Sequence, residues 1–293
     1  AQNNLGVIYE RGEYVKRDMN KAIHYFSLAS NQNIPQAQYN LGFIYYSGFF
    51  IKKDINKGKQ YIMLSSYNEF RLANFAHGFL LHEEKKIIEA IHYYKEASSF
   101  NIQYAKNNLG IIYKHGFGEE IPKRIGDSIV YFEEAIRQKN DILSMYNLAH
   151  IHIYEETIKR DIDKSIELLI KSSNEFDHSF NLLCVVLIKT FEFNIEKIKH
   201  EIDKRLEKTN KLYAEILTTI DSLIDSGEFY VDYIYETYRN KDFLYDILHH
   251  HICSSDLLNE NTDQKEKDPN LEDISEDFYE GFGFDLINRN ANS

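Results

Sequence analysis

Residues 1–30 read AQNNLGVIYERGEYVKRDMNKAIHYFSLAS, and residues 37–66 read AQYNLGFIYYSGFFIKKDINKGKQYIMLSS. The two stretches align without a gap at a period of 36 residues, with leucine, glycine, tyrosine and aspartate at matching positions. A period of that length is typical of solenoids, in which one supersecondary unit is repeated. The sequence therefore predicts a stack of similar units.

Three further copies follow with small changes in length. Residues 105–113 and 128–135 match the first and second halves of the opening copy, and residues 147–164 hold another. Between the second copy and residue 105 lies an eroded copy, which opens at Ala73 and closes at Ala97. We therefore expect about five copies over residues 1–174.

Each copy has the pattern of a helical hairpin. The first half places its apolar residues at the spacing of one helix face: Ala1, Leu5, Ile8 and Tyr9. Gly12 suits the left-handed residue that ends a helix, and Asp18 suits the N-cap of the next one. The second half has its own apolar stripe: Ala22, Tyr25, Phe26 and Ala29. Gly6 and Ala22 are small where the two helices would cross, and one such hairpin must stack on neighbours to bury its face.

The combined pattern is A-x-x-x-L-G-x-x-Y-x-x-G followed by D-x-x-K-A-x-x-Y-x-x-x-A. It resembles the Sel1-like repeat, a relative of the tetratricopeptide repeat, over residues 1–174. Gly58 and Ser128 stand in place of the usual alanine, His77 in place of the leucine and Ala149 in place of a glycine. These departures predict weakened packing in the third and fifth copies. The resemblance implies an all-α solenoid that acts as an adaptor or scaffold in protein interactions.

Residues 175–258 are predicted to be degenerate repeat or capping helices. The uniformly apolar stretch 176–189 predicts a buried helix, and Asn194 is a candidate N-cap for one long helix ending near Gly227. Apolar residues seven apart on that segment leave two interpretations, a solenoid cap or a coiled-coil seam. Residues 229–252 predict a last aromatic helix or pair of helices.

The net charge of the chain is -12, and residues 259–293 hold ten acids and three bases. This tail is predicted to be disordered and acidic. Residues 277–287 (DFYEGFGFDLI) set aromatic side chains among acids, which favours a short binding motif, a tail that folds back, or a frayed terminus. The rest of the chain is only weakly acidic, which disfavours binding to nucleic acid.

No motif indicates chemistry, so we expect no enzyme, no cofactor and no metal. The histidines 249–251 and Cys253 do not predict a metal site. Adjacent side chains on a helix point in different directions and cannot all reach one ion, and structural zinc usually needs four ligands. Two cysteines make no disulfide framework, no segment is apolar enough to span a membrane and no signal peptide is visible, so we expect a cytoplasmic or nuclear protein. Because Ala1 falls inside a repeat, we also expect residues to precede it.

The resemblance implies a binding site on the concave face, which the first helices of the hairpins line. Its positions lie two before, two after and five after the repeat leucine. In the second to fifth copies they include the eleven candidate contacts Tyr39, Phe43, Tyr46, Phe75, Phe79, His82, Asn107, Ile111, Lys114, Tyr146 and His150, and the twelfth position is Ile153. Large aromatic side chains exposed there are typical of a protein-binding hot spot. The alternative is that neighbouring first helices pack these rings against one another.

The sequence therefore favours a non-catalytic scaffold or adaptor that binds a protein or peptide in a concave groove. A second hypothesis is the regulatory C-terminal region of a larger enzyme, such as a protein kinase, whose catalytic domain would precede Ala1. The identity of the partner and the oligomeric state do not follow from the pattern.

Overall fold

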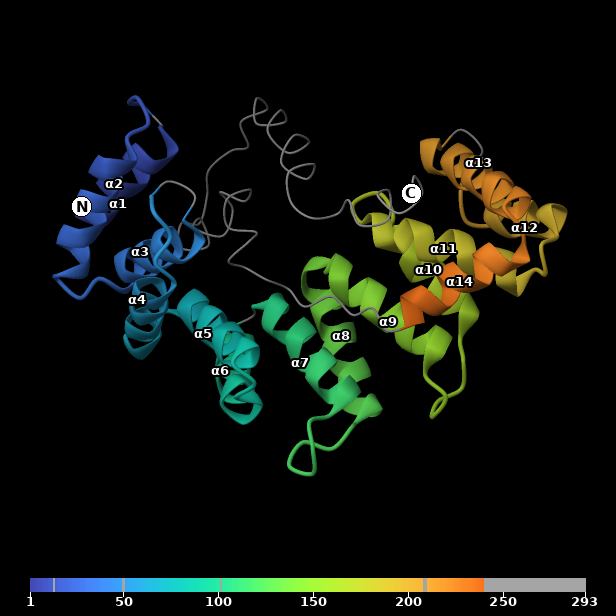
Figure 1. Cartoon of the computed structure of the whole chain (residues 1–293), viewed down its shortest axis with the longest axis horizontal. Coiled ribbons are helices and arrows are strands. Elements are labelled where there is room, and N and C mark those ends of the chain that lie inside the picture. The colour runs from blue at the N-terminus through green and yellow to red at the C-terminus, as the bar shows by residue number, and fades with distance from the viewer. Residues whose placement is uncertain (13, 49–50, 101, 208–209, 240–293) are drawn as a thin grey trace. The chain divides into compact units, whose positions relative to one another are not determined.

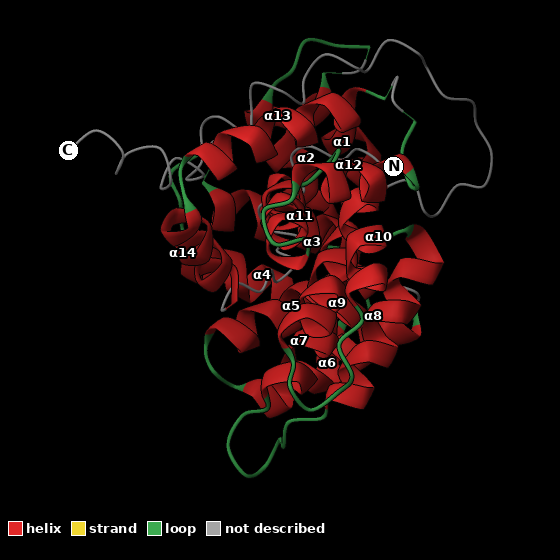
Figure 2. Ribbon diagram, turned by 90° about the vertical axis from the view of Figure 1, so that its right-hand side faces the viewer, coloured by secondary structure: helices red, strands yellow, loops and turns green. Residues whose placement is uncertain are grey.

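The computed structural model describes residues 1–12, 14–48, 51–100, 102–207 and 210–239, all within one compact unit, Ala1–Tyr245. These residues form helices and connecting turns and no β-strand; a single isolated bridge joins Phe117 and Ile121 (Figure 2). The predicted all-α solenoid is confirmed for this part of the chain. Consecutive helices pack as antiparallel neighbours from α1 to α11 (Figure 1).

Five hairpins account for the first ten helices. Their first helices are α1 (Gln2–Arg11), α3 (Pro35–Ser47), α5 (Arg71–Glu83), α7 (Gln103–His115) and α9 (Ile142–Tyr154). Their second helices are α2 (Met19–Ser30), α4 (Ile55–Tyr67), α6 (Ile87–Ser99), α8 (Ile125–Lys139) and α10 (Ile162–Ser172). Each second helix also contacts the first helix of the next hairpin, so every copy is stacked on the one before it.

The predicted helix boundaries follow from local chemistry. Gly12 and Gly48 end α1 and α3 in the left-handed conformation, with φ of 76° and 71°. Asp18 and Asp54 cap the second helices, because the carboxylate of each accepts the backbone N–H three residues later at 3.0 Å. Asp161 does the same for α10. Both predictions about Gly12 and Asp18 are confirmed.

One backbone hydrogen bond closes the turn in all five copies. The N–H of the residue before the second helix donates to the carbonyl of the residue four after the repeat leucine position. The donor and acceptor pairs are Asp18 and Tyr9, Asp54 and Tyr45, Lys86 and Leu81, Arg124 and Tyr113, and Asp161 and His152, at 2.7–3.3 Å. We call this bond the turn clasp. It ties the start of each second helix to the last turn of the first helix.

Small residues allow the two helices of a hairpin to cross closely. A Cβ atom added to Gly42 would lie 2.7 Å from the Ile62 side chain and 3.1 Å from the Gly58 carbonyl oxygen. A Cβ atom added to Gly58 would lie 2.6 Å from the backbone nitrogen of Tyr46. In the first copy, Gly6 faces the Phe26 ring in the same way. The prediction that these positions lie at helix crossings is confirmed.

Stacked tyrosines join the two helices in three of the hairpins. The pairs Tyr9 and Tyr25, Tyr45 and Tyr61, and Tyr113 and Tyr131 have ring centroids 5.6–6.0 Å apart and nearly parallel planes. A cation covers one ring of each pair: Lys21 over Tyr9, Lys57 over Tyr45 and Arg124 over Tyr113. These contacts explain why tyrosine recurs at both positions of the repeat pattern.

Four more helices follow the repeats: α11 (Asp177–Thr190), α12 (Ile195–Asp203), α13 (Lys211–Asp225) and α14 (Glu228–Arg239). The buried helix predicted at 176–189 is confirmed, since residues 182–188 of α11 are all buried. Asn194 caps α12 as predicted, with its side chain accepting from the Lys197 N–H at 3.0 Å. Residues of the aromatic segment after Arg239, the histidine run with Cys253, and the whole acidic tail lie outside the described residues.

The single long helix predicted from Asn194 to near Gly227 is wrong, and with it the coiled-coil seam. The helix ends at Asp203, and Asn210 caps a new one by accepting from the Leu212 N–H at 2.9 Å. In one straight helix, Ile202 and Ile220 would be about 27 Å apart, beyond the length of α11. The break lets α12 and α13 fold back, so that both isoleucines are buried in one cluster with α11.

Candidate functional site

The eleven residues predicted for the concave face are here called the first-helix surface, because they lie on α3, α5, α7 and α9. The structure places ten of them in the interior, at no more than 7% exposure. Tyr46 is half-buried. The prediction of a largely exposed aromatic patch is therefore wrong for this set, although their role in partner binding is a separate question.

The aromatic members pack on rings from the adjoining turns and helices. Tyr39 meets the edge of Phe70 with ring centroids 5.4 Å apart, and Phe75 lies 5.7 Å from Tyr94 and 6.1 Å from Tyr104. Phe43 and Phe79 are buried on the same two helices, at 2% and 6% exposure. The alternative interpretation, that neighbouring first helices pack these rings together, accounts for the contact of Phe75 with Tyr104 on α7. Phe70 lies in the turn before α5 and Tyr94 lies on the second helix α6, so the other contacts come from elsewhere.

His82 is buried at the end of α5, between Tyr94 and Phe117, with ring centroids 6.2 Å and 5.9 Å away. Burial lowers the pKa of His82 to about 4, so the imidazole is neutral near pH 7. A neutral ring in this position acts as an aromatic packing residue and does not attract acidic groups.

Polar side chains link α7 to α9. The Asn107 side-chain oxygen accepts from Asn147 Nδ2 at 2.9 Å and from Ser144 Oγ at 3.2 Å. Ile111 is buried on the same helix, at 5% exposure. Buried amide groups need such partners, so the asparagines fix the register of two successive hairpins.

Lys114 and His150 form a second link between these helices. His150 Nε2 lies 3.0 Å from the backbone carbonyl oxygen of Tyr238, which can only accept a hydrogen bond, so Nε2 carries the proton. Nδ1 is then free to accept from Lys114 Nζ at 3.1 Å. Tyr154 Oη also donates to a backbone carbonyl of α14, that of Tyr235, at 2.8 Å. These bonds anchor α14 on α9.

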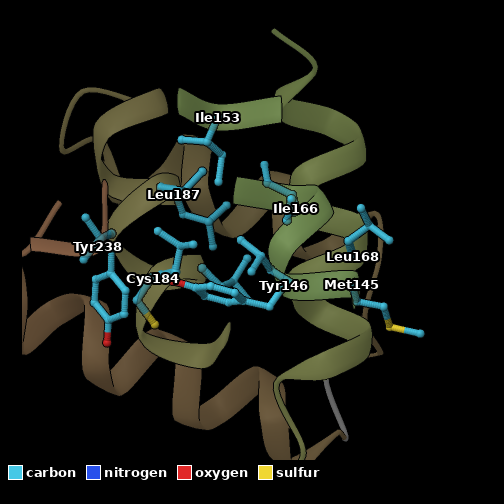
Figure 3. Close-up of a cluster of buried hydrophobic side chains, with 14 of the residues drawn as sticks. Met145, Tyr146, Ile153, Ile166, Leu168, Cys184, Leu187 and Tyr238 are labelled. Atoms are coloured by element: carbon cyan, nitrogen blue, oxygen red, sulfur yellow. The ribbon is translucent and has the colours of Figure 1, made fainter. Parts of the chain in front are cut away.

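Tyr146 is buried in an apolar cluster that extends from the fourth hairpin to α14 (Figure 3). Its ring meets the edge of Phe176 at 5.5 Å, and the cluster gathers side chains from α9, α10, α11 and α14, including Leu187 and Cys184. Burial strongly raises the pKa of the Cys184 thiol, so this cysteine is not a reactive thiolate. The sequence could not have shown that α14 completes this site, because the residues of α9 and α14 that bond to each other are 81 and 88 positions apart.

Two hollows on the described part of the chain are lined without any residue of the first-helix surface. One of about 650 Å³ is lined by Tyr45, Lys52, Lys53, Asp54, Ile55 and Asn56. The other, of about 340 Å³, is lined by Lys95, Tyr113, Arg124, Asp127, Val130, Tyr131 and Glu134. Both adjoin a stacked tyrosine pair and the start of a second helix.

The described residues contain no group of three or more histidine, cysteine, aspartate or glutamate side chains that could hold a metal ion. Among the same residues, no helix combines the length and apolar character needed to cross a membrane.

The profile of the Sel1 repeat matches five segments: residues 1–34, 35–62, 69–99, 103–140 and 142–175. Together they cover more than half of the chain. The chain belongs to the Sel1 repeat family. The five segments correspond to the five hairpins, including the eroded third copy, so the family suggested by the repeat pattern is confirmed.

Solved structures of other Sel1 repeat proteins share this fold. One is a Sel1 repeat protein from Oxalobacter formigenes, with a TM-score of 0.59 and 21% identity, covering 78% of this chain and 87% of the other. Another is a protective antigen of uropathogenic Escherichia coli strains with an SLR fold, with a TM-score of 0.59 and 20% identity, covering 83% of this chain and 57% of the other. At these identities the likeness concerns the fold alone. No curated protein sequence matches the chain.

Proposed function

We propose that this Sel1 repeat protein is a non-catalytic scaffold that binds a protein or peptide partner through the accessible part of Tyr46, the one residue of the first-helix surface that is not buried. The ten buried residues of that surface hold α3 and its neighbours in place. Sel1 repeats generally serve protein–protein interactions, which supports the scaffold role. The observation that carries the proposal is the exposure pattern: the surface runs across successive hairpins, and Tyr46 is its half-buried member.

The surroundings of Tyr46 suit a contact residue. Its backbone packs on Gly58 at the helix crossing, which fixes the position of the side chain. Lys53 Nζ lies 5.7 Å from the centre of the ring. A rigidly held tyrosine with a cation at its face offers apolar area and charge together, a combination that protein interfaces use often.

The test begins with a partner identified for the full chain and its dissociation constant measured by titration. Replacing Tyr46→Ala should weaken that binding by about tenfold or more, which corresponds to roughly 1.4 kcal/mol. The matched control is Tyr14→Ala, because Tyr14 is 96% exposed and lies in the turn between α1 and α2. Equal affinities for the two variants would exclude this surface as the binding site.

The alternative hypothesis, a regulatory region of a larger enzyme such as a protein kinase, stays a prediction. The absence of an active site in this chain stays a prediction too, and an assay of the full-length product for phosphoryl transfer would test both.

A further inference from the structure

Two consecutive cations precede the second helix in every copy. They occupy positions 16–17, 52–53, 85–86, 123–124 and 159–160. In four copies, two glutamates also lie between the end of the first helix and this pair, at positions 10 and 13, 83–84, 119–120 and 155–156. We call them the turn glutamates. In the second copy, positions 46–51 hold no acid, and residues 37–66 have four lysines and one aspartate, a net charge of +3 in a chain whose net charge is -12.

The turn glutamates pair with turn cations where both are present. In the third copy, Lys86 Nζ lies 2.9 Å from a carboxylate oxygen of Glu84. Lys123 Nζ of the fourth copy lies 2.7 Å from a carboxylate oxygen of Glu155 in the fifth. A carboxylate is therefore the partner that cations take in these turns.

Lys52 and Lys53 of the second copy are exposed and line the hollow of about 650 Å³. Within the described part of the chain, no carboxylate lies within ion-pair distance of either ammonium group. Asp54, the one acid of this stretch, caps α4 by accepting from the Lys57 N–H. Lys53 Nζ faces the Tyr46 ring, at 5.7 Å from its centre. Two cations are thus held together without the acids that the other turns provide.

The rest of the lining adds apolar area and further positive charge. Tyr45 stacks on Tyr61 with ring centroids 6.0 Å apart, and Ile55 is 44% exposed. Lys57 Nζ lies 3.9 Å from the centre of the Tyr45 ring. The hollow also adjoins the start of α4, a helix of 13 residues whose N-terminus carries partial positive charge. These groups suit a ligand that has negative charge beside an apolar side chain.

We propose that this hollow, here called the lysine hollow, binds an acidic segment of another protein. Carboxylates of that segment lie beside Lys52 and Lys53, in the role that the turn glutamates have in the other copies. An adjacent apolar side chain of the segment lies against Tyr45 and Ile55. The inference rests on the proposed function and adds the class of partner, because Lys53 both lines the hollow and faces the Tyr46 ring.

A nucleic acid fits the lysine hollow less well than a peptide does. Phosphate backbones are bound by cations that continue along a surface. In the second hollow, Arg124 is paired with Asp127 at 3.0 Å, and Glu134 also lines the site. The cations without acidic partners therefore do not continue to that hollow, and a short acidic segment is the favoured ligand.

The test measures the binding of a fluorescein-labelled peptide, in which glutamates flank one phenylalanine, to the full chain by fluorescence anisotropy. We expect saturable binding at low salt that weakens as salt is added, because exposed charges are screened. Replacing Lys52→Glu together with Lys53→Glu should weaken this binding by about tenfold or more, since attraction is replaced by repulsion. A peptide with glutamine in place of glutamate should bind far more weakly.

The matched control replaces Lys159→Glu together with Arg160→Glu, the equivalent exposed pair in the fifth copy, where the turn glutamates are present. This variant has the same change in net charge and should keep most of the affinity for the peptide. Three results would overturn the proposal: equal losses in the two double variants, no saturable binding of the peptide, or tighter binding of a duplex DNA probe than of the peptide.

Tyr46→Ala, measured with the same peptide, separates this inference from the proposed function. A loss of affinity in the lysine variant with full affinity in Tyr46→Ala would support the lysine hollow and exclude Tyr46 as a contact. A loss in Tyr46→Ala with full affinity in the lysine variant would support Tyr46 and overturn the lysine hollow.

Discussion

Single residues set how closely the helices of a hairpin approach, and glycine at the crossing is the clearest case. Gly42 could be assigned to a crossing from the sequence, because it recurs one residue after the repeat leucine. Its exact neighbours, Ile62 and Gly58, could not, because they depend on the register between two helices.

Replacing Gly42→Leu should overpack this crossing and destabilise the chain by about 1–3 kcal/mol. The matched control is Gly126→Leu on α8, where an added Cβ would meet nothing within 4 Å. That variant should be neutral or slightly stabilised, since leucine favours a helix more than glycine does. Urea unfolding of both variants measures the difference, and equal midpoints would mean that the crossing tolerates a larger side chain.

His77 shows how the eroded copy accommodates a polar residue in place of leucine. Ser66 Oγ donates to Asn74 Oδ1 at 2.8 Å, so its oxygen accepts from His77 Nδ1 at 3.2 Å. The ring also packs against Tyr93, with centroids 4.1 Å apart. The weakened packing predicted here is thus offset by hydrogen bonds that no sequence pattern signals.

Burial lowers the pKa of His77 from its ordinary value of 6.5 to about 4. By smaller amounts, the charge of Glu84 raises this pKa and the charge of Lys86 lowers it. The unfolded chain binds a proton at His77 more readily than the folded chain does. The contribution of neutral His77 to the free energy of unfolding is therefore complete above pH 6.5 and falls as the pH drops toward 4. His77→Leu should flatten that part of the curve of melting temperature against pH. The control is His92→Leu at an exposed position, which should leave the curve unchanged. If the curve of His77→Leu ran parallel to that of the original chain, the pH dependence would not come from His77.

At the scale of the element, the sequence predicted the end of α1 at Gly12 and the starts of α2 and α12 at Asp18 and Asn194, because caps and glycines act locally. It failed for the segment after Asn194, where apolar spacing alone fits either one long helix or two short ones. It also failed for the exposure of the first-helix surface. The positions were taken from the family resemblance, but their burial depends on rings and backbone of this chain, such as Phe70 and α14.

Truncation should separate the buried members of this surface from Tyr46. Phe75→Ala should destabilise the chain by about 3–5 kcal/mol, because a fully buried ring is replaced by a cavity. Tyr46→Ala should cost about 1 kcal/mol, since alanine keeps the Cβ that packs on Gly58. Denaturant titrations of both variants provide the measurement. A similar loss in the two would show that Tyr46 is a core residue and is unsuited to partner binding.

At the scale of the whole molecule, the repeats contact mainly their immediate neighbours, so stability should be close to a sum of local terms. Phe75 on α5 and Leu169 on α10 share no contact cluster. The free-energy losses of Phe75→Ala and Leu169→Ala should therefore add in the double variant to within about 0.5 kcal/mol.

Asn107→Ala and Asn147→Ala provide the contrasting pair, because these side chains share a hydrogen bond. Their losses should differ from a simple sum by about 0.5 kcal/mol or more. Urea unfolding of the single and double variants measures both cycles. Strong coupling between Phe75 and Leu169 would mean that the array unfolds through contacts that reach beyond adjacent hairpins.

The turn clasp has a consequence for how the chain can change in length. The clasp is kept whether the segment it closes is short, from Leu81 to Lys86, or long, from Tyr113 to Arg124. Lengthening a flexible loop costs little, roughly 0.6 kcal/mol for each doubling. The loop closed by each turn clasp is therefore a site that tolerates insertion. An epitope, a protease site or a natural insertion can be placed there while the helices stay in register.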